Sequence, residues 1–187
     1  MGKLYILMGP AGSGKTTIGR ELGKIFGMKF FTTITTRPMR PGEVQNEDYY
    51  FISKEEFLKL RAEDKLAEDI EYAGNMYGTT KESLLKIPKS PTDYYVALTI
   101  DAYKDYMKFL TEENIVVIFI WANRGTIIQR MKDRGATDED IQKRLKHYGS
   151  DVEACALADY AVTNDIDIDY AVNKISNYIR VNMKKAS

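Results

Sequence analysis

Several classes of protein are excluded by what this chain of 187 residues lacks. Its one cysteine, Cys155, excludes an internal disulfide framework and a cysteine-rich zinc site. Its one histidine, His147, excludes a multi-histidine metal centre and weakens any Ser-His-Asp triad. Lysine plus arginine and aspartate plus glutamate each total 27. The chain therefore has no basic excess of the kind that binds nucleic acids or membrane surfaces.

Long hydrophobic runs are also missing. The longest, Ile115 to Ala122, is far shorter than a membrane span, and Leu4 to Met8 is too short for the apolar part of a signal peptide. With 44% hydrophobic and 29% charged residues, the chain has the composition of a globular protein. We therefore expect a single soluble cytoplasmic domain without nucleic-acid or membrane partners. The sequence leaves its oligomeric state open.

Short apolar runs alternate with helical patterns along the chain. Leu4–Met8, Tyr94–Ile100 and Ile115–Ala122 are continuous and rich in β-branched or aromatic residues, which predicts buried parallel strands. The helical patterns have apolar residues three or four positions apart: Ile18, Leu22, Ile25 and Phe26 before Gly27; Ile127, Ile128 and Met131 after Asn123; and Ile168, Ala171, Ile175 and Tyr178. This alternation predicts an α/β domain with a parallel sheet flanked by helices.

Two polar segments interrupt the alternation. Residues 32–82 are rich in Thr, Tyr, Gly and charge; residues 48–53 suggest a half-exposed strand, and Ser53 with Glu56 forms a capping box before Phe57. This segment predicts a small mixed α/β insertion. Residues 132–150 are highly charged, and Thr137 with Asp140 could begin a helix. The remaining segments, 1–31, 83–131 and 151–187, form the predicted core.

A phosphate-binding motif joins the first strand to the first helix. It fits the pattern G-x-x-x-x-G-K-[ST], in which backbone N–H groups cradle phosphates, the lysine neutralises β and γ oxygens, and the hydroxyl binds Mg²⁺. An ordinary glycine-rich turn is the alternative, but the strand before and the helix after favour the phosphate-binding motif. The predicted ATP-binding residues of the motif are Gly9, Pro10, Ala11, Gly12, Ser13, Gly14, Lys15, Thr16 and Thr17, with Thr16 as the metal ligand.

The insertion carries residues suited to a phosphate monoester. Arg37 and Arg40 lie three apart beside turn residues, and Tyr49 and Tyr77 follow. Arginine forks bind phosphate with two hydrogen bonds, and phenols add neutral donors. Taken alone, these residues would favour a solvated loop with structural tyrosines.

Together with the motif, these segments resemble the guanylate kinase family from the phosphate-binding loop to about Asp165. The resemblance rests on GPAGSGKTT, TTRPMRPGE, EDYYF, AEDIEYAGNMYGTT, the Thr99-Ile100-Asp101 strand end, QRMKDRGATDEDIQKRL and VTND. It implies a P-loop nucleoside monophosphate kinase with a parallel core sheet, an acceptor-binding insertion (32–82) and a helical lid (132–150). It further implies ATP and GMP as substrates and Mg²⁺ bound with ATP.

The resemblance also assigns roles to individual residues. GMP-binding roles fall on Thr33, Arg37, Arg40, Tyr49, Glu68, Tyr77, Thr79 and Asp101. Glu68 would read guanine, whose N1–H and N2–H₂ a carboxylate can accept together. Catalytic roles around the transferring phosphate fall on Lys15, Arg130, Arg134 and Arg144, and Asn164 would lie near the adenine of ATP.

This chain departs from the family pattern at several positions. Thr33 stands where serine is common, Thr99 replaces an aspartate, Tyr103-Lys104 replaces Gln-Gly, and the lid after Gly135 is one residue shorter. Other acceptors, dGMP or a modified purine nucleotide, remain alternatives to GMP. A non-catalytic phosphopeptide-binding module is a further alternative, which intact Lys15 and Thr16 disfavour. For the remaining candidates we expect a surface position for His147, a buried position for Cys155 and a core position for Trp121.

Overall fold

The core sheet of the computed structural model, which describes residues 1–72 and 74–185, is parallel throughout. Its strand order is β2-β7-β1-β8-β9. The strands are β1 (Leu4–Met8), β2 (Lys29–Phe30), β7 (Tyr94–Ala97), β8 (Ile115–Trp121) and β9 (Tyr160–Thr163). The three predicted strands are confirmed. The edge strands β2 and β9 were not predicted, because with two and four residues they are too short to give a clear pattern.

Alternate residues of β1 face opposite sides of the sheet and enter two hydrophobic clusters. Leu4, Ile6 and Met8 belong to a cluster with residues such as Leu84, Tyr106 and Leu110. Tyr5 and Leu7 pack with the first and last helices of the chain. All five residues of β1 are buried. This strand is therefore covered on both faces, as its unbroken apolar sequence predicts.

Eight helices and three short 3₁₀ segments are found within the described parts of the chain. Helix α1 begins after Gly14 and ends at Gly27, and both glycines have left-handed φ angles. The α-helices are α1 (Lys15–Phe26), α2 (Lys54–Ala62), α3 (Lys81–Lys86), α4 (Ile100–Tyr106), α5 (Arg124–Asp133), α6 (Asp138–Leu145), α7 (Tyr148–Glu153) and α8 (Ile168–Lys185). The 3₁₀ segments are η1 (Ile87–Lys89), η2 (Glu112–Asn114) and η3 (Ala154–Leu157). None of the helices in residues 1–72 and 74–185 is long and apolar enough to cross a membrane.

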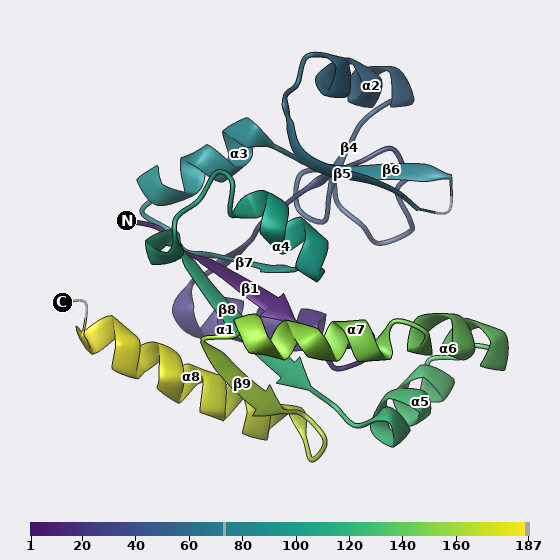
Figure 1. Ribbon diagram of the computed structural model, residues 1–187, viewed down its shortest axis with the longest axis vertical. Helices are drawn as coiled ribbons and strands as arrows, with labels where there is room; N and C mark the ends of the chain where they lie inside the picture. The colour runs from purple at the N-terminus through teal and green to yellow at the C-terminus, as the bar shows by residue number, and fades with distance from the viewer. Residues whose placement is uncertain (73, 186–187) are drawn as a thin grey trace.

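A second sheet forms a separate lobe above the core sheet in Figure 1. Its order is β4-β3-β6-β5, with β3 (Ile34–Thr35), β4 (Tyr50–Phe51), β5 (Leu66–Tyr72) and β6 (Asn75–Thr80). Four buried residues, Ile34, Phe57, Leu66 and Met76, form its small core. The strand expected over residues 48–53 covers only Tyr50–Phe51, the two residues that pair with the two-residue strand β3. The capping box of Ser53 and Glu56 at α2 is confirmed.

Helices α5, α6 and α7 lie at the end of the core toward which β1 and β8 point (Figure 1). Their apolar residues Ile127, Met131, Ile141 and Leu145 pack with Ala122 in a cluster of their own. Asn123 and Thr137 cap α5 and α6, as predicted. The division of the chain into core, insertion and lid stays a prediction.

Three local expectations need correction. Thr99, Ile100 and Asp101 do not end a strand: β7 stops at Ala97, and the Thr99 hydroxyl accepts from Ala102 N–H to cap α4. Cys155 is exposed rather than buried, because it lies on the outer side of η3 while Ala154 faces the core. Trp121 is half-buried at the edge of the core, where its ring meets Tyr148 at 5.9 Å.

Candidate active site

The phosphate-binding loop connects β1 to α1 and owes its shape to glycine. Gly9, Gly12 and Gly14 have φ angles of +134°, +86° and +100°, which other residues rarely adopt. A Cβ on Gly9 would lie 2.2 Å from the carbonyl oxygen of Ile120, and one on Gly14 would lie 2.4 Å from Asn164 Nδ2. The loop therefore packs against the Ile120 backbone and the Asn164 side chain at distances that only glycine permits.

The N-terminus of α1 is left open. Gly14 offers no side chain to cap the first-turn N–H groups, and the first turn contains no acidic residue. Thr16 and Thr17 are exposed there. Unsatisfied N–H groups and the helix dipole together favour an anion at this end of the helix. The arrangement suits a phosphate chain.

Lys15 lies in the loop with its ammonium group withdrawn from solvent. Nζ donates to the carbonyl oxygens of Gly9 (2.6 Å) and Pro10 (2.9 Å). Burial lowers the pKa of Lys15 to about 8, and the negative charge of Asp151 partly opposes that shift. The Asp151 carboxylate accepts from the backbone N–H of Ala11, and its own pKa is raised by burial. A carboxylate of α7 thus faces the loop in this conformation.

Two hollows meet at Lys15. One, of about 440 Å³, contains Thr16 and reaches Asp48 and Tyr49 of the second lobe. The other, of about 640 Å³, is lined by Asp101 of α4 and Arg144 of α6. The fold therefore brings Lys15, Thr16, Tyr49, Asp101 and Arg144 around one cleft at the carboxyl end of the sheet, where parallel α/β sheets bind ligands.

The guanidinium of Arg37 is buried and already paired. Its Nη1 and Nη2 donate to the two carboxylate oxygens of Glu43 at 3.0 and 2.7 Å. Its Cζ lies 5.6 Å from the centre of the Tyr49 ring, and the rings of Tyr49 and Tyr77 are 6.0 Å apart. Arg40 is exposed nearby, and its backbone N–H donates to Glu43. The predicted phosphate-binding set is therefore assembled in one place.

Glu68 lies half-buried on β5 opposite Thr79 of β6. The Thr79 hydroxyl donates to Glu68 Oε1 at 2.9 Å. Burial raises the pKa of Glu68, although the Thr79 hydrogen bond opposes that shift. No ion pair involves Glu68 anywhere in the described chain. Thr33 is half-buried beside β3, and its backbone carbonyl accepts a hydrogen bond from Tyr50 N–H.

The remaining predicted residues are less closely gathered. Arg130 on α5 donates through Nη2 to the carbonyl oxygen of Asn164 at 2.6 Å. Asn164 is 2% exposed, and its Nδ2 donates to the Ser13 carbonyl oxygen at 2.8 Å. Asn164 thus supports the phosphate-binding loop from behind and leaves almost no surface for a base in this conformation. Arg134 is exposed at the end of α5 and lines neither hollow.

Sequence reasoning missed three residues that the structure places at the site. Glu43 lies in the TTRPMRPGE segment, so its charge close to Arg37 was a usable signal. Asp151 and Tyr106 belong to helices distant in sequence and carry no local signal. Only the packing of α7 and α4 brings them to Lys15 and Thr79.

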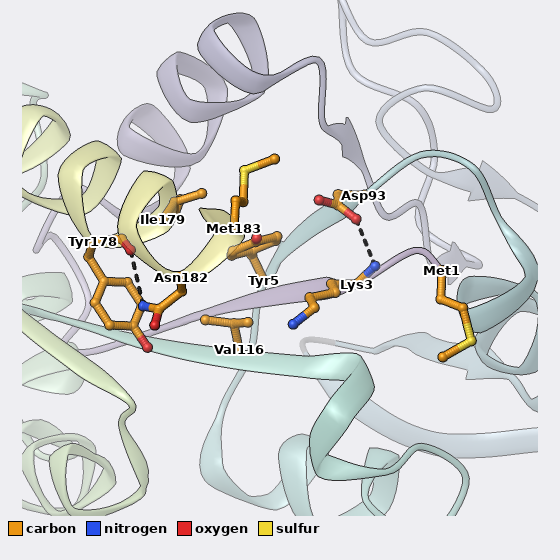
Figure 2. A pocket seen from close by; sticks show the side chains of 9 residues that line it. All are labelled: Met1, Lys3, Tyr5, Asp93, Val116, Tyr178, Ile179, Asn182 and Met183. Carbon is orange, nitrogen blue, oxygen red and sulfur yellow. Dashed lines mark hydrogen bonds between the residues drawn. The ribbon is translucent and has the colours of Figure 1, made fainter. Parts of the chain in front are cut away.

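A further hollow of about 230 Å³ lies at the opposite end of the core, near both chain termini. Figure 2 shows Lys3 N–H donating to Asp93 and the Asn182 side-chain amide donating to the backbone carbonyl of Tyr178 at its rim. It contains none of the predicted site residues.

Comparisons with known proteins show which proteins the chain resembles over its length. Residues 1–182 match the family model described as "Guanylate kinase". A guanylate kinase of Desulfitobacterium hafniense is 32% identical over 180 residues, covering 95% of this chain and 89% of that one. One from Nostoc sp. is 34% identical over 177 residues, covering 93% and 87%. The crystal structure of guanylate kinase from Anaplasma phagocytophilum superimposes with a TM-score of 0.71 at 26% identity, covering 97% and 86%.

Proposed function

The chain belongs to the guanylate kinase family, and from that premise we propose that it transfers the γ-phosphate of ATP to GMP, forming ADP and GDP. The reaction needs no covalent enzyme intermediate. The protein's work is to align the phosphate oxygen of GMP with the γ-phosphorus of ATP and to stabilise the charge that spreads over the transferring group.

The observation that carries the choice of guanine is the environment of Glu68. Its carboxylate is half-buried and receives one neutral hydrogen bond from Thr79, and within residues 1–72 and 74–185 it forms no ion pair with a lysine or arginine. Guanine presents two adjacent donors, N1–H and N2–H₂, to such a group. Adenine presents an acceptor at N1 and lacks the N2 amine, so it would leave a partly buried charge unsatisfied.

The phosphate of GMP would bind beside Arg37, Arg40, Tyr49 and Tyr77. Arg37 is held by Glu43 in a two-pronged pair. A phosphate monoester presents the same planar pair of oxygens to a guanidinium as a carboxylate does. We expect the acceptor phosphate to compete with Glu43 for this fork, with the phenol of Tyr49 or Tyr77 as an added donor.

ATP would bind with its phosphates over the open N-terminus of α1. Lys15, now bonded to Gly9 and Pro10, would turn to the β- and γ-phosphate oxygens. No cluster of three or more His, Cys, Asp or Glu residues in the described regions could hold a metal ion by itself. The exposed Thr16 hydroxyl would be the protein ligand for Mg²⁺ that arrives with ATP. When bound, the ion neutralises phosphate charge.

The lid arginines would complete the charge around the transferring phosphate. Arg144 already lines the cleft with Lys15, whereas Arg130 and Arg134 do not. We propose that the lobe of residues 32–82 and the lid of residues 132–150 close when both nucleotides bind. Closure would exclude water, which otherwise competes as phosphate acceptor. The cytoplasmic location and the absence of nucleic-acid and membrane partners stay predictions.

An ADP-release assay against GMP, dGMP, IMP and AMP tests this function. We expect kcat/KM to be at least about a hundredfold higher for GMP than for AMP, because AMP would leave the partly buried charge of Glu68 unpaired. Glu68→Gln replaces one acceptor with a donor and should narrow that ratio. Glu71→Gln, an exposed change on the same strand, is the matched control. Equal use of AMP and GMP by the wild type would refute guanine selection, and a higher rate with dGMP would favour that acceptor.

A further inference from the structure

Tyr106 ends helix α4 and is fully buried, yet its hydroxyl points out of the core cluster toward the second lobe. The phenol oxygen lies 2.7 Å from Thr79 Oγ1 on β6. Thr79, itself 1% exposed, lies 2.9 Å from Glu68 Oε1. Three side chains from α4, β6 and β5 therefore form one continuous chain of hydrogen bonds.

The direction of this chain follows from counting protons. An ionised carboxylate only accepts, so the single hydroxyl proton of Thr79 is donated to Glu68. Thr79 then has no proton left for Tyr106, and the 2.7 Å contact requires Tyr106 to donate to Thr79. The phenol keeps its proton because burial raises the pKa of Tyr106 far above neutrality.

The core holds the first member of the chain in place. The Tyr106 ring meets Phe31 edge-on, with centroids 6.3 Å apart, inside the cluster that includes Leu4 and Leu110. Phenylalanine would fill almost the same volume, so packing alone does not call for the hydroxyl. The hydroxyl instead connects helix α4, whose Tyr106 ring is packed in the core, to a side chain on the second lobe.

From this geometry we infer that Tyr106 is a positioning residue for guanine selection: it orients the Thr79 hydroxyl, which occupies one lone pair of Glu68 Oε1 and so fixes the direction in which the carboxylate faces the two donors of the base. The inference rests on the proposed function, because it assigns Glu68 to the acceptor base. It adds a determinant that lies outside the acceptor-binding lobe and does not touch the nucleotide.

Tyr106→Phe tests the inference with the ring retained. One neutral hydrogen bond corresponds to about a twofold to tenfold change in an equilibrium constant. We therefore expect KM for GMP to rise about threefold to tenfold, while KM for ATP and kcat at saturating GMP stay within about twofold. The kcat/KM ratio of GMP to IMP, which lacks the N2 amine, should fall. Tyr103→Phe, on the same helix but outside this hydrogen-bond chain, should change none of these values.

A double-mutant cycle distinguishes a chain from two separate contacts. Thr79→Val breaks the middle link, so adding Tyr106→Phe to that variant should cause no further rise in KM for GMP. A carboxyl ¹³C titration should show a higher Glu68 pKa in Tyr106→Phe than in the wild type, because the donor to its oxygen is weakened. This readout does not depend on turnover.

The possible failures are separable. If the wild type does not phosphorylate GMP, the proposed function is wrong. If the wild type does so and Tyr106→Phe lowers only the melting temperature, with KM for GMP and the GMP-to-IMP ratio unchanged, the positioning role is wrong and the hydroxyl is structural. Additive effects of the two substitutions would also overturn the inference. Should Tyr106→Phe fail to fold, Thr79→Val against Thr79→Ser still tests the chain, and equal KM values for GMP would refute it.

Discussion

Two helix N-termini in this molecule are built in opposite ways. Helix α1 of the core begins after Gly14, without a side-chain cap and without an acidic residue in its first turn. Helix α2 of the second lobe begins after Ser53. The Ser53 side chain accepts from Glu56 N–H, the Glu56 side chain accepts from Ser53 N–H, and Glu55 adds negative charge to the first turn. The first N-terminus is left ready for an external anion, and the second already has internal ones.

The same contrast extends to the two halves of the cleft. The phosphate-binding loop is backbone packed on backbone: Gly9 lies against the Ile120 carbonyl, deep in the core sheet. The acceptor half depends on side chains, with Arg37 held by Glu43 and Glu68 held by Thr79. The donor half is therefore shaped before any nucleotide arrives, whereas in the acceptor half the pair of Arg37 with Glu43 is a contact that a substrate phosphate can exchange.

Lys15→Ala should separate the two halves most sharply. Removing this charge should lower kcat at least about a thousandfold, because the ammonium acts on the transferring phosphate. GMP affinity, measured by calorimetry, should stay within about twofold, since the acceptor contacts are untouched. Lys24→Ala, an exposed change on the same helix, is the control. A folded Lys15→Ala protein with wild-type turnover would remove the kinase mechanism.

Arg37→Ala should damage only the acceptor half. A charge-assisted hydrogen bond is worth about 1.5–3 kcal/mol, so KM for GMP should rise roughly 10- to 150-fold. ATP affinity should remain within about twofold. Arg40→Ala should show a smaller effect in the same direction, because Arg40 is exposed. Separate titrations of the two nucleotides measure this difference, and equal losses for both would mean that the arginines are structural.

The pKa of Lys15 predicts how ATP affinity depends on pH. The pKa is lowered to about 8 in the nucleotide-free protein, and bound phosphates would raise it by favouring the charged form. Well below pH 8 Lys15 is already charged and should add no pH dependence of its own to ATP affinity. Above pH 8 binding must take up a proton, so the Kd for ATP should rise up to about tenfold per pH unit. Lys15→Arg, which stays charged, should show no such rise; a parallel rise in both proteins would refute the assignment.

The sequence predicted the donor half better than the acceptor half for a physical reason. Strand β1, the glycine loop and α1 are contiguous, so Leu4 to Phe26 contains every signal needed. The chain's resemblance to a known family supplied the acceptor residues, but no local pattern placed Glu43 against Arg37, Tyr106 against Thr79, or Asp151 against the loop. Those contacts depend on tertiary packing. The same limit explains Thr99, whose hydroxyl caps α4 where an extension of the preceding strand was expected.

The smallest predicted effect concerns the capped N-terminus of the second lobe. Ser53→Ala removes the acceptor of Glu56 N–H and half of the capping box, which should lower the free energy of unfolding by about 1 kcal/mol. Ser53→Thr, which keeps a hydroxyl, should lose much less. The N-terminus of α2 is already satisfied by Ser53, Glu55 and Glu56, so we do not expect it to bind ATP. Neither change should therefore alter the Kd for ATP, whose phosphates we expect at the open N-terminus of α1. Urea unfolding with and without ATP measures both quantities. A loss of ATP-dependent stabilisation in Ser53→Ala would show that the two N-termini are coupled and that the contrast between them is wrong.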